Sequence, residues 1–238
     1  MEILNDVLGY KNTKIIQDSE MFNFTLDSVF LARFVSFRQR DKKILDIGTN
    51  NGIIPIILTK YFKGTIDAID IQQPAIDLSL KNLKLNNIEN QVNLILKDIN
   101  EYKVANENKY DVVVCNPPFY KKGEAKLSNN EAVEIARQEK YLTLKQLVQK
   151  AKSLLNNKGY FYIVLRASRL QELMVLFNEN NFGVQKLKFI YPKITKPANS
   201  VLVEARLLSN SNIVVEKPLI THNEDNTYTK EAQKYFED

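Results

Sequence analysis

The chain has almost none of the residues that build crosslinks or metal centres. Its 238 residues include one cysteine, Cys115, one histidine, His222, and no tryptophan. A single cysteine excludes an intrachain disulfide and a cysteine-rich metal cage. A single histidine disfavours a zinc site or a catalytic triad built on histidine. We therefore expect no metal in this protein.

Long apolar runs are also missing. A membrane-spanning helix needs roughly 18 consecutive apolar residues, and Ile53–Leu58, which is among the longest runs here, contains Pro55. The first residues, Met1–Asp6, carry acidic side chains and lack the cationic and then apolar order of a signal peptide. We expect a cytoplasmic protein that does not engage a membrane.

The charge balance is basic, with a net charge of +5 and a pI of about 9.0. A positive surplus favours polyanionic partners such as nucleic acids. A composition rich in lysine and asparagine can also reflect the base composition of a genome, so the charge alone leaves the partner open. The apolar content of 44% and the charged content of 26% are ordinary for a globular protein with a sizeable core.

Short β-branched runs alternate with amphipathic stretches through the middle of the chain. The predicted strands are Lys42–Gly48, Thr65–Ile71, Val92–Asp98, Tyr110–Cys115 and Gly159–Leu165. The predicted helices are Ile54–Phe62, Pro74–Asn86, Leu142–Asn156 and Ser168–Asn180. Strands that alternate with helices predict a doubly wound α/β fold with a parallel sheet covered on both faces.

The end of this pattern differs from an ordinary dinucleotide-binding fold. Val184–Tyr191 and Ser200–Leu208 are strand-like runs joined by Pro192–Asn199, with no helix between them. Such a pair predicts a hairpin, in which one strand runs antiparallel to the rest of the sheet. A mostly parallel sheet finished by a hairpin is the Rossmann-like arrangement of class I S-adenosylmethionine methyltransferases.

We expect one domain over residues 1–238; the sequence leaves the oligomeric state open, with a monomer slightly favoured. Residues 1–40 would be an extension over the cofactor site, and they include an amphipathic helix from Leu26 that Thr25 caps. Residues 41–208 would be the catalytic core. Residues 209–238 would form a polar tail with a short helix near Thr229–Phe236.

A glycine-containing segment, Asp46–Gly52, follows the first core strand and precedes a helix. Gly48 permits a tight turn and a close approach of a ligand to the backbone. Gly48 and Gly52 are spaced G-x-x-x-G, unlike the G-x-G-x-x-G that cradles a pyrophosphate. The looser turn suits the smaller amino-acid part of S-adenosylmethionine, so we expect Asp46, Gly48 and Gly52 to bind this cofactor.

Acidic residues end the next two predicted strands. Asp70 is placed to accept hydrogen bonds from both ribose hydroxyls, and Asp98 to accept one from the adenine amino group. Ile71 and Ile99, each directly after an acid, could sandwich the adenine ring. An aspartate at one strand end more often caps a helix or solvates a loop. The four strand ends that carry Asp46, Asp70, Asp98 and Asn116 together favour a ligand site.

The predicted strand Tyr110–Cys115 ends in Asn116-Pro117-Pro118-Phe119. Two prolines stiffen the turn because each restricts φ and lacks an N–H group. The Asn116 oxygen and the Pro117 carbonyl can each accept an N–H from a planar amino group, and Phe119 can stack on its ring. Positioning then activates the nitrogen for methylation without a strong base. A rigid turn without catalytic role is the alternative, and Cys115 itself is expected to be buried rather than nucleophilic.

Together these segments resemble the bacterial tRNA(Val) adenine N6-methyltransferases, which modify the adenine at tRNA position 37. The resemblance covers most of the chain. It rests on Phe24–Ala32, Leu45–Gly52, Asn116–Phe119, Ile135–Glu139, Asn199–Glu204 and His222–Thr229.

The resemblance implies S-adenosylmethionine as the methyl donor, bound by Asp46, Gly48, Asp70 and Asp98, with the target adenine at Asn116–Phe119. The chain departs from the family pattern in two places. Gln138 stands where histidine is expected, in a loop over the active site. Asp70 stands where glutamate is expected, which shortens the ribose contact by one methylene.

Two basic patches are candidates for binding RNA phosphates. The first lies between the Asn-Pro-Pro-Phe motif and the next helix, and it consists of Lys121, Lys122, Lys126 and Arg137. The second lies on the predicted hairpin, and it consists of Lys186, Lys188, Lys193 and Lys196. For the first patch, a solvated loop without RNA contacts is about as plausible.

The leading hypothesis is therefore an adenine N6-methyltransferase that acts on a tRNA anticodon loop. An enzyme acting on protein glutamine or on guanine in RNA shares the tetrapeptide motif. Protein-glutamine enzymes usually carry tyrosine at the position of Phe119 and a separate N-terminal helical domain. A non-catalytic RNA-binding module with the same fold has no need of Asp46, Asp70, Asp98 and Asn116 together.

Overall fold

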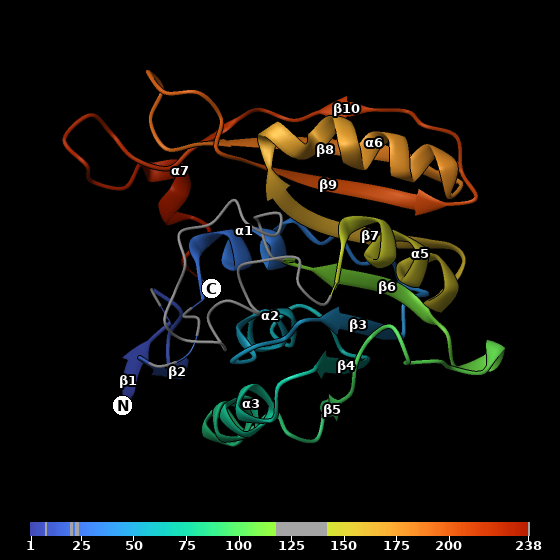
Figure 1. The fold of residues 1–238 in the computed structure, drawn as a ribbon. Helices are drawn as coiled ribbons and strands as arrows, with labels where there is room; N and C mark the ends of the chain where they lie inside the picture. Colours follow the sequence, from blue (N-terminus) through green and yellow to red (C-terminus); the bar gives the residue numbers. More distant parts are fainter. Residues whose placement is uncertain (8, 20, 22–23, 118–141, 238) are drawn as a thin grey trace.

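The computed structural model describes residues 1–7, 9–19, 21, 24–117 and 142–237 (Figure 1). Five parallel strands form one part of its main sheet. They are β3 (Lys43–Ile47), β4 (Thr65–Asp70), β5 (Val92–Leu96), β6 (Tyr110–Cys115) and β7 (Leu155–Arg166). Their order is β7–β6–β3–β4–β5, so the winding reverses at the neighbours β3 and β6. Ligands of open α/β sheets bind beyond the carboxyl ends of the strands at such a reversal.

The predicted hairpin completes the sheet. Strand β9 (Ser200–Leu207) lies between β7 and β8 (Phe182–Tyr191) and is antiparallel to both. Two short strands of the tail, β10 (Val214–Val215) and β11 (Leu219–Ile220), pair with β8 in parallel. The expected fold class, a mostly parallel sheet with an antiparallel C-terminal strand, is therefore confirmed.

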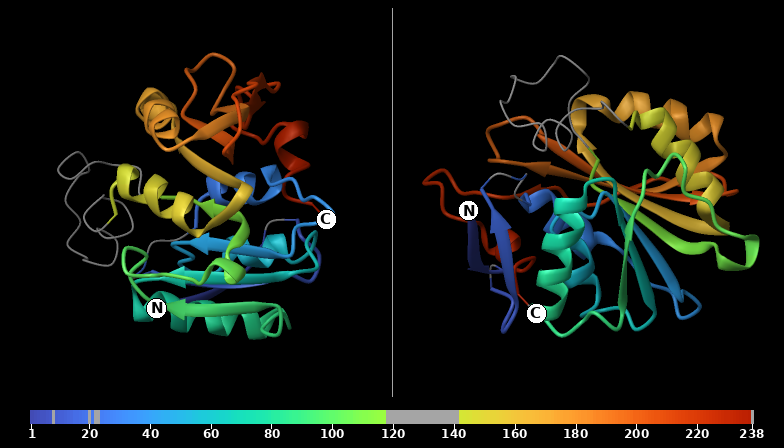
Figure 2. Two further views of the ribbon diagram at one scale, coloured as in Figure 1. Left: turned by 90° about the vertical axis from the view of Figure 1, so that its right-hand side faces the viewer. Right: turned by 60° about the horizontal axis from the view of Figure 1, so that its bottom comes forward.

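Helices cover both faces of the sheet (Figures 1 and 2). One face carries α1 (Leu26–Phe34), α2 (Ile53–Leu58) and α3 (Gln73–Leu85), and the other carries α5 (Leu144–Leu154) and α6 (Leu170–Glu179). Alternate residues of a strand enter opposite cores, as the pleat requires. In β6, Val112 and Val114 pack on the α1 face, whereas Val113 and Cys115 pack on the α5 face.

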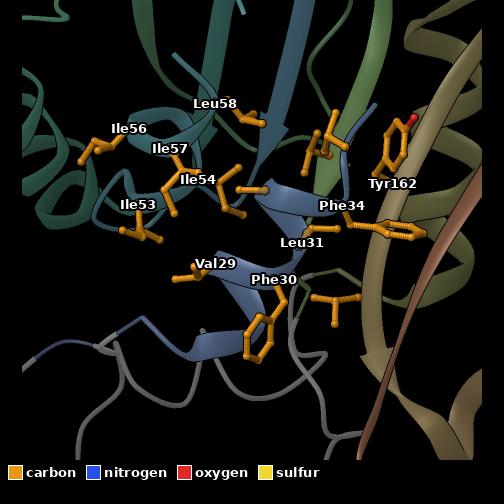
Figure 3. Close-up of a cluster of buried hydrophobic side chains, with 14 of the residues drawn as sticks. Val29, Phe30, Leu31, Phe34, Ile53, Ile54, Ile56, Ile57, Leu58 and Tyr162 are labelled. Carbon is orange, nitrogen blue, oxygen red and sulfur yellow. The ribbon is translucent and has the colours of Figure 1, made fainter. Parts of the chain in front are cut away.

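Helix α1 is buried on nearly all sides, so the expectation of an amphipathic helix was wrong. Val29, Leu31 and Phe34 lie among the isoleucines of α2 and beside Tyr162 of β7 (Figure 3). Phe30 contacts the rings of Tyr235 and Phe236 in the tail. This packing fixes α1 above the middle of the sheet. None of the described helices is long and apolar enough to span a membrane.

An N-terminal hairpin, which the sequence did not predict, packs on α3. It pairs β1 (Glu2–Asp6) with β2 (Lys14–Asp18). The Asn82 amide accepts from the Ile16 N–H at 2.6 Å and donates to the Ile16 carbonyl at 3.0 Å. Asn86 makes the same pair of bonds to Lys14, at 3.1 and 2.8 Å. Asn82 of α3 and Asn86, which directly follows this helix, thus bind β2 as a neighbouring strand would.

The C-terminal tail packs on the face of the sheet that carries α1. Its short helix α7 (Lys230–Gln233) is capped by the Thr229 hydroxyl, which accepts from the Ala232 N–H at 3.1 Å. This confirms the short helix expected there. Most predicted core strands and helices agree with the structure to within a few residues, but β7 begins at Leu155 and β5 ends at Leu96.

Candidate functional site

The loop after β3 turns sharply at the carboxyl edge of the sheet. Gly48, Asn50 and Gly52 have φ values of 75°, 52° and 82°, which glycine and asparagine adopt most readily. A Cβ at Gly48 would meet nothing within 4 Å, so backbone conformation rather than crowding favours glycine there. The N–H groups of Gly48 and Thr49 both donate to the Ile69 carbonyl, at 2.9 and 3.1 Å. The end of β4 therefore anchors this loop.

Side chains from α3 and β4 hold the rest of the loop. The Ser79 hydroxyl donates to the Asn50 carbonyl at 2.7 Å, and Asn82 donates to the Asn51 carbonyl at 2.9 Å. Asp70 accepts from the Asn50 N–H at 2.9 Å. The loop backbone is therefore well bonded.

Asp46 is the penultimate residue of β3, and its side chain is 0% exposed. Within the described part of the chain, neither carboxylate oxygen has a hydrogen-bond partner. Burial, together with a smaller contribution from the nearby Asp70 carboxylate, raises the pKa of Asp46 from 3.8 to about 7. The Thr49 hydroxyl opposes this rise in pKa, although the pair falls short of hydrogen-bond geometry. Asp46 thus offers two free acceptor oxygens at the edge of the sheet.

Unpartnered polar atoms are concentrated around Asp46. Among the described residues, seven buried side-chain nitrogen or oxygen atoms lack a partner, and they belong to Thr25, Asp46, Thr49, Asn51 and Asn116. These residues stand at the start of α1, at the end of β3 with its loop, and directly after β6. A buried polar group without a partner costs about 1–3 kcal/mol, so native proteins contain few of them. Their concentration at one edge indicates a place where a polar ligand completes the bonding.

Asp70, by contrast, is already bonded. Its two oxygens accept from the N–H groups of Asn50 and Gln72, at 2.9 and 3.0 Å. Burial raises the pKa of Asp70, and these backbone bonds oppose the rise. A carboxylate oxygen has a second lone pair, so a ribose contact is compatible with this arrangement and stays a prediction.

The residues predicted to hold an adenine ring lie nearby. Asp98 stands two positions beyond β5, and its oxygen accepts from the Asn100 N–H at 2.8 Å. The chain is joined to the previous strand there, because the Lys97 N–H donates to the Asp70 carbonyl at 3.0 Å. Ile71 is 40% exposed, whereas Ile99 is 6% exposed and packs in the core on the α5 face. Of these two side chains, Ile71 presents the larger free apolar surface.

Asn116 extends the site across β6, the neighbour of β3. Its Nδ2 donates to the Ser28 hydroxyl of α1 at 2.8 Å, and its Oδ1 is buried without a partner. No described residue donates to the Pro117 carbonyl. Two hydrogen-bond acceptors therefore remain available, as the motif predicts.

Several predicted residues lie outside the part of the chain that the structure describes. They are Pro118, Phe119, Lys121, Lys122, Lys126, Arg137 and Gln138. Their proposed contacts with a base and with RNA phosphates stay predictions. Cys115 is described, and it is 1% exposed. Burial raises the pKa of its thiol, which confirms the expectation of a buried rather than a nucleophilic cysteine.

Two residues of the first helix region differ from expectation. Thr25 occupies the N-cap position, but its hydroxyl makes no capping bond and is one of the unpartnered atoms. Ser28 was not singled out as a site residue. The sequence feature that could have identified Ser28 is its place in the segment Phe24–Ala32, where a serine interrupts the apolar residues of a buried helix.

Two of the four lysines in the second basic patch are paired with carboxylates, and contacts of this patch with RNA stay a prediction. Lys188 is 8% exposed and lies 3.6 Å from the Glu216 carboxylate, and Lys186 lies 3.3 Å from buried Glu204. Lys186 and Lys188 lie two residues apart in β8, so they share one face of the sheet, and each pairs with a carboxylate of the fold. Lys193 donates to the Glu224 carbonyl at 2.8 Å, and Lys196 is exposed on the turn.

Comparisons with known proteins agree with this geometry. Residues 25–189 match the model of the methyltransferase small domain family. A tRNA1(Val) (adenine(37)-N6)-methyltransferase of Flavobacterium psychrophilum is 25% identical, over 94% of this chain and 95% of that protein. One from Aliivibrio salmonicida is 27% identical, over 84% and 82%. The resemblance noted in the sequence is thereby confirmed.

Solved structures show the same fold. A predicted O-methyltransferase from Agrobacterium tumefaciens superposes with a TM-score of 0.69 at 17% identity, over 88% of this chain and 95% of that one. The Trm5 protein of Methanocaldococcus jannaschii, solved with adenosine, superposes with a TM-score of 0.62 at 18% identity, over 89% and 57%. At such identities the likeness concerns the fold alone.

Proposed function

Because the chain belongs to the methyltransferase small domain family, we propose that it methylates the N6 amino group of an adenine in tRNA. The methyl donor is S-adenosylmethionine, as the family implies. The proposed target is the adenine at position 37 of tRNA(Val). The observation that carries this proposal is the set of unpartnered buried atoms that joins the loop after β3 to Asn116.

The described residues fit this cofactor. Asp46 offers an uncompensated buried carboxylate for an ammonium group, and the open space beside Gly48 admits a ligand close to the backbone. In this proposal Asp70 binds the ribose, Asp98 the adenine amino group, and Ile71 one face of the ring. When bound, the cofactor supplies a methyl group on a positively charged sulfur.

Asn116 and Pro117 provide the acceptor half of the site. The Asn116 Oδ1 and the Pro117 carbonyl each accept one N–H of a planar amino group. Such a nitrogen is a poor nucleophile because its lone pair is delocalised into the ring. Two accepted hydrogen bonds enrich it in electrons and hold it in one orientation, so positioning and electrostatics carry the reaction.

The support for tRNA comes from the relatives and from the charge. The curated relatives that carry the tRNA1(Val) name align with most of this chain, and the net charge of +5 suits a polyanion. An anticodon-loop adenine is also less costly to extrude than a base-paired one, which takes about a few kcal/mol.

The proposed division of labour follows the same geometry. Residues 1–40 form an extension beside the cofactor loop, because Asn82 binds both the Ile16 backbone of β2 and the Asn51 carbonyl. Residues 41–208 form the catalytic core. Residues 209–237 form a tail that packs against β8 and α1.

The test is to incubate the protein with S-adenosylmethionine and unmodified tRNA, and to identify the methylated nucleosides by mass spectrometry. We expect N6-methyladenosine in total tRNA and in a tRNA(Val) transcript, and none when adenine 37 of that transcript is replaced by guanine. Methylated guanosine would reassign the acceptor to a guanine amino group. No methylated nucleoside, with cofactor binding confirmed, would overturn the RNA substrate and favour a protein glutamine.

A further inference from the structure

Ser28 places a hydroxyl group directly beside the proposed catalytic carboxamide. It lies in the first turn of α1, is 5% exposed, and accepts from the Asn116 Nδ2 at 2.8 Å. The two residues are 88 positions apart in the chain, so the contact depends on the tertiary fold.

The hydrogen bond bears on which end of the amide faces the reacting nitrogen. A carboxamide can rotate by half a turn, which exchanges its oxygen with its NH2 group. In the observed orientation the bond to Ser28 uses one N–H, and Oδ1 is the unpartnered atom. The rotated amide would accept from Ser28 and leave two buried N–H groups without acceptors. The observed orientation is the one that turns an acceptor oxygen, rather than two N–H donors, toward the site.

The position of Ser28 is fixed by its surroundings. The preceding residue, Asp27, accepts from the Ser200 hydroxyl at 3.4 Å and lies near the Arg166 guanidinium. Ser200 and Arg166 are directly paired at the ends of β9 and β7. The first turn of α1 is thus tied to the strands beyond β6. Sites built on such packed elements hold their geometry better than sites on loops.

We propose that Ser28 is a positioning residue that turns the Asn116 amide so that its oxygen, and not its NH2 group, faces the amino group to be methylated. The expected effect on the rate of methyl transfer rests on the proposed function. The hydrogen bond itself can be tested without any assumption about the substrate. In the opposite orientation the Asn116 NH2 group would face the substrate amino group, and these two hydrogen-bond donors would repel each other.

The first test compares single-turnover methyl transfer in Ser28→Ala, Ser28→Thr and the wild type. We expect Ser28→Ala to slow transfer by about 10-fold or more, the size of a lost orienting hydrogen bond. Ser28→Thr keeps the hydroxyl and should restore most of the rate. Cofactor affinity, tRNA affinity and melting temperature should change little. Ser153→Ala is the matched control, because that exposed hydroxyl bonds only within α5, to the Lys150 carbonyl at 2.8 Å.

A double mutant separates orientation from support of the fold. A carboxylate has two equivalent oxygens, so Asn116→Asp presents an acceptor in either orientation. Ser28→Ala should then slow transfer by less than about 3-fold in the Asn116→Asp background, because an acceptor oxygen faces the substrate whichever way the carboxylate is turned. An equal loss in both backgrounds, or a wild-type rate in Ser28→Ala, would overturn the proposal.

A measurement of the amide itself distinguishes failure of this inference from failure of the proposed function. In protein labelled with 15N-asparagine, the side-chain signal of Asn116 is identified by its absence in Asn116→Asp. We expect its amide protons to exchange with water faster in Ser28→Ala than in the wild type, whether or not the protein methylates RNA. Equal exchange would overturn the hydrogen bond and with it the proposal. A wild type without RNA methylation but with accelerated exchange in Ser28→Ala would overturn only the RNA substrate.

Discussion

Two buried carboxylates on the same sheet have opposite surroundings. Glu204 of β9 is 2% exposed and is fully partnered, by Arg38 at 3.1 Å, Lys186 at 3.3 Å and the Tyr162 hydroxyl at 3.1 Å. Asp46 of β3 is 0% exposed, and neither of its oxygens has a described partner. Among the described residues, two cations pair with Glu204 and none pairs with Asp46.

This contrast distinguishes a buried carboxylate that stabilises the fold from one that is available to a ligand. The Glu204 network ties residues near the N-terminus to the hairpin, because Arg38 also donates to the Ser36 carbonyl and the Tyr162 hydroxyl. It is complete without a ligand. The Asp46 site is complete only when something binds. A buried charge is costly unless it is paired, so we interpret Asp46 as retained for its ligand.

The largest expected effect comes from removing the unpartnered acceptor at the substrate. Asn116→Ala should slow methyl transfer by about 100-fold or more, the usual loss for one preorganised catalytic hydrogen-bonding group. Cofactor affinity should stay within about 3-fold, because the other proposed cofactor contacts lie at the carboxyl ends of β3 and β4 and after β5. Transfer rates and calorimetric affinities measure the two effects. Equal loss of both would mean that Asn116 binds the cofactor.

Breaking the satisfied network should act on stability instead. Glu204→Ala leaves Arg38 and Lys186 without their shared carboxylate, and those side chains are about one-third exposed. Water screens them in part, so we expect a loss of about 2 kcal/mol, or roughly 4–8 °C in melting temperature for a chain of this size. Activity per folded molecule should be retained. A stable variant without activity would place Glu204 in the site and contradict the comparison.

Asp46→Asn should have the opposite effect on the ligand-free protein. The substitution keeps the shape of the side chain and removes an unpaired buried charge. At pH 8 we expect an increase in stability of about 1 kcal/mol, or roughly 2–4 °C in melting temperature. Thermal unfolding without cofactor measures it. Destabilisation by a similar amount would show that the Asp46 charge is compensated within the fold.

The pH dependence sharpens the same comparison. The pKa of Asp46 is about 7 in the fold and 3.8 ordinarily, so the folded state binds the extra proton between these values. The contribution of Asp46 to stability is therefore full below about pH 4 and is lost as the pH rises through about 7. The other titrating groups contribute equally to the unfolding free energies of the wild type and Asp46→Asn, so their contributions cancel in the difference between the two. We expect the stability of the wild type to fall relative to that of Asp46→Asn as the pH rises from 5 to 8. A difference that does not change with pH would contradict the raised pKa.

Much of this arrangement was predictable from local sequence. Strand β6 has the predicted bounds, Tyr110–Cys115, because a β-branched run there meets two prolines that cannot continue it. Asp46, Asp70 and Asn116 stand at the carboxyl ends of their strands, as predicted, and parallel strands bring these ends to one edge. The hairpin of β8 and β9 was evident because no helix separates the two runs.

The remainder depends on tertiary contacts that no local pattern encodes. The β1–β2 hairpin is held through its backbone by Asn82 of α3 and by Asn86 directly after it, in addition to the packing of Ile15 in the core. Lys188 looks like a surface cation in the sequence, yet the tail covers it and supplies Glu216. The role of Ser28 follows only from the approach of α1 to the end of β6, which the alternation of strands and helices does not specify.

The most direct test of the central claim is calorimetric titration of S-adenosylmethionine into the wild type, Asp46→Asn and Glu204→Gln at pH 8. The account predicts one bound cofactor per chain for the wild type, and affinity at least about 10-fold weaker for Asp46→Asn, since a charge-assisted contact is lost. Glu204→Gln should bind as the wild type does. No binding by the wild type, or equal affinity in wild type and Asp46→Asn, would contradict the assignment of the unpartnered atoms to a cofactor site.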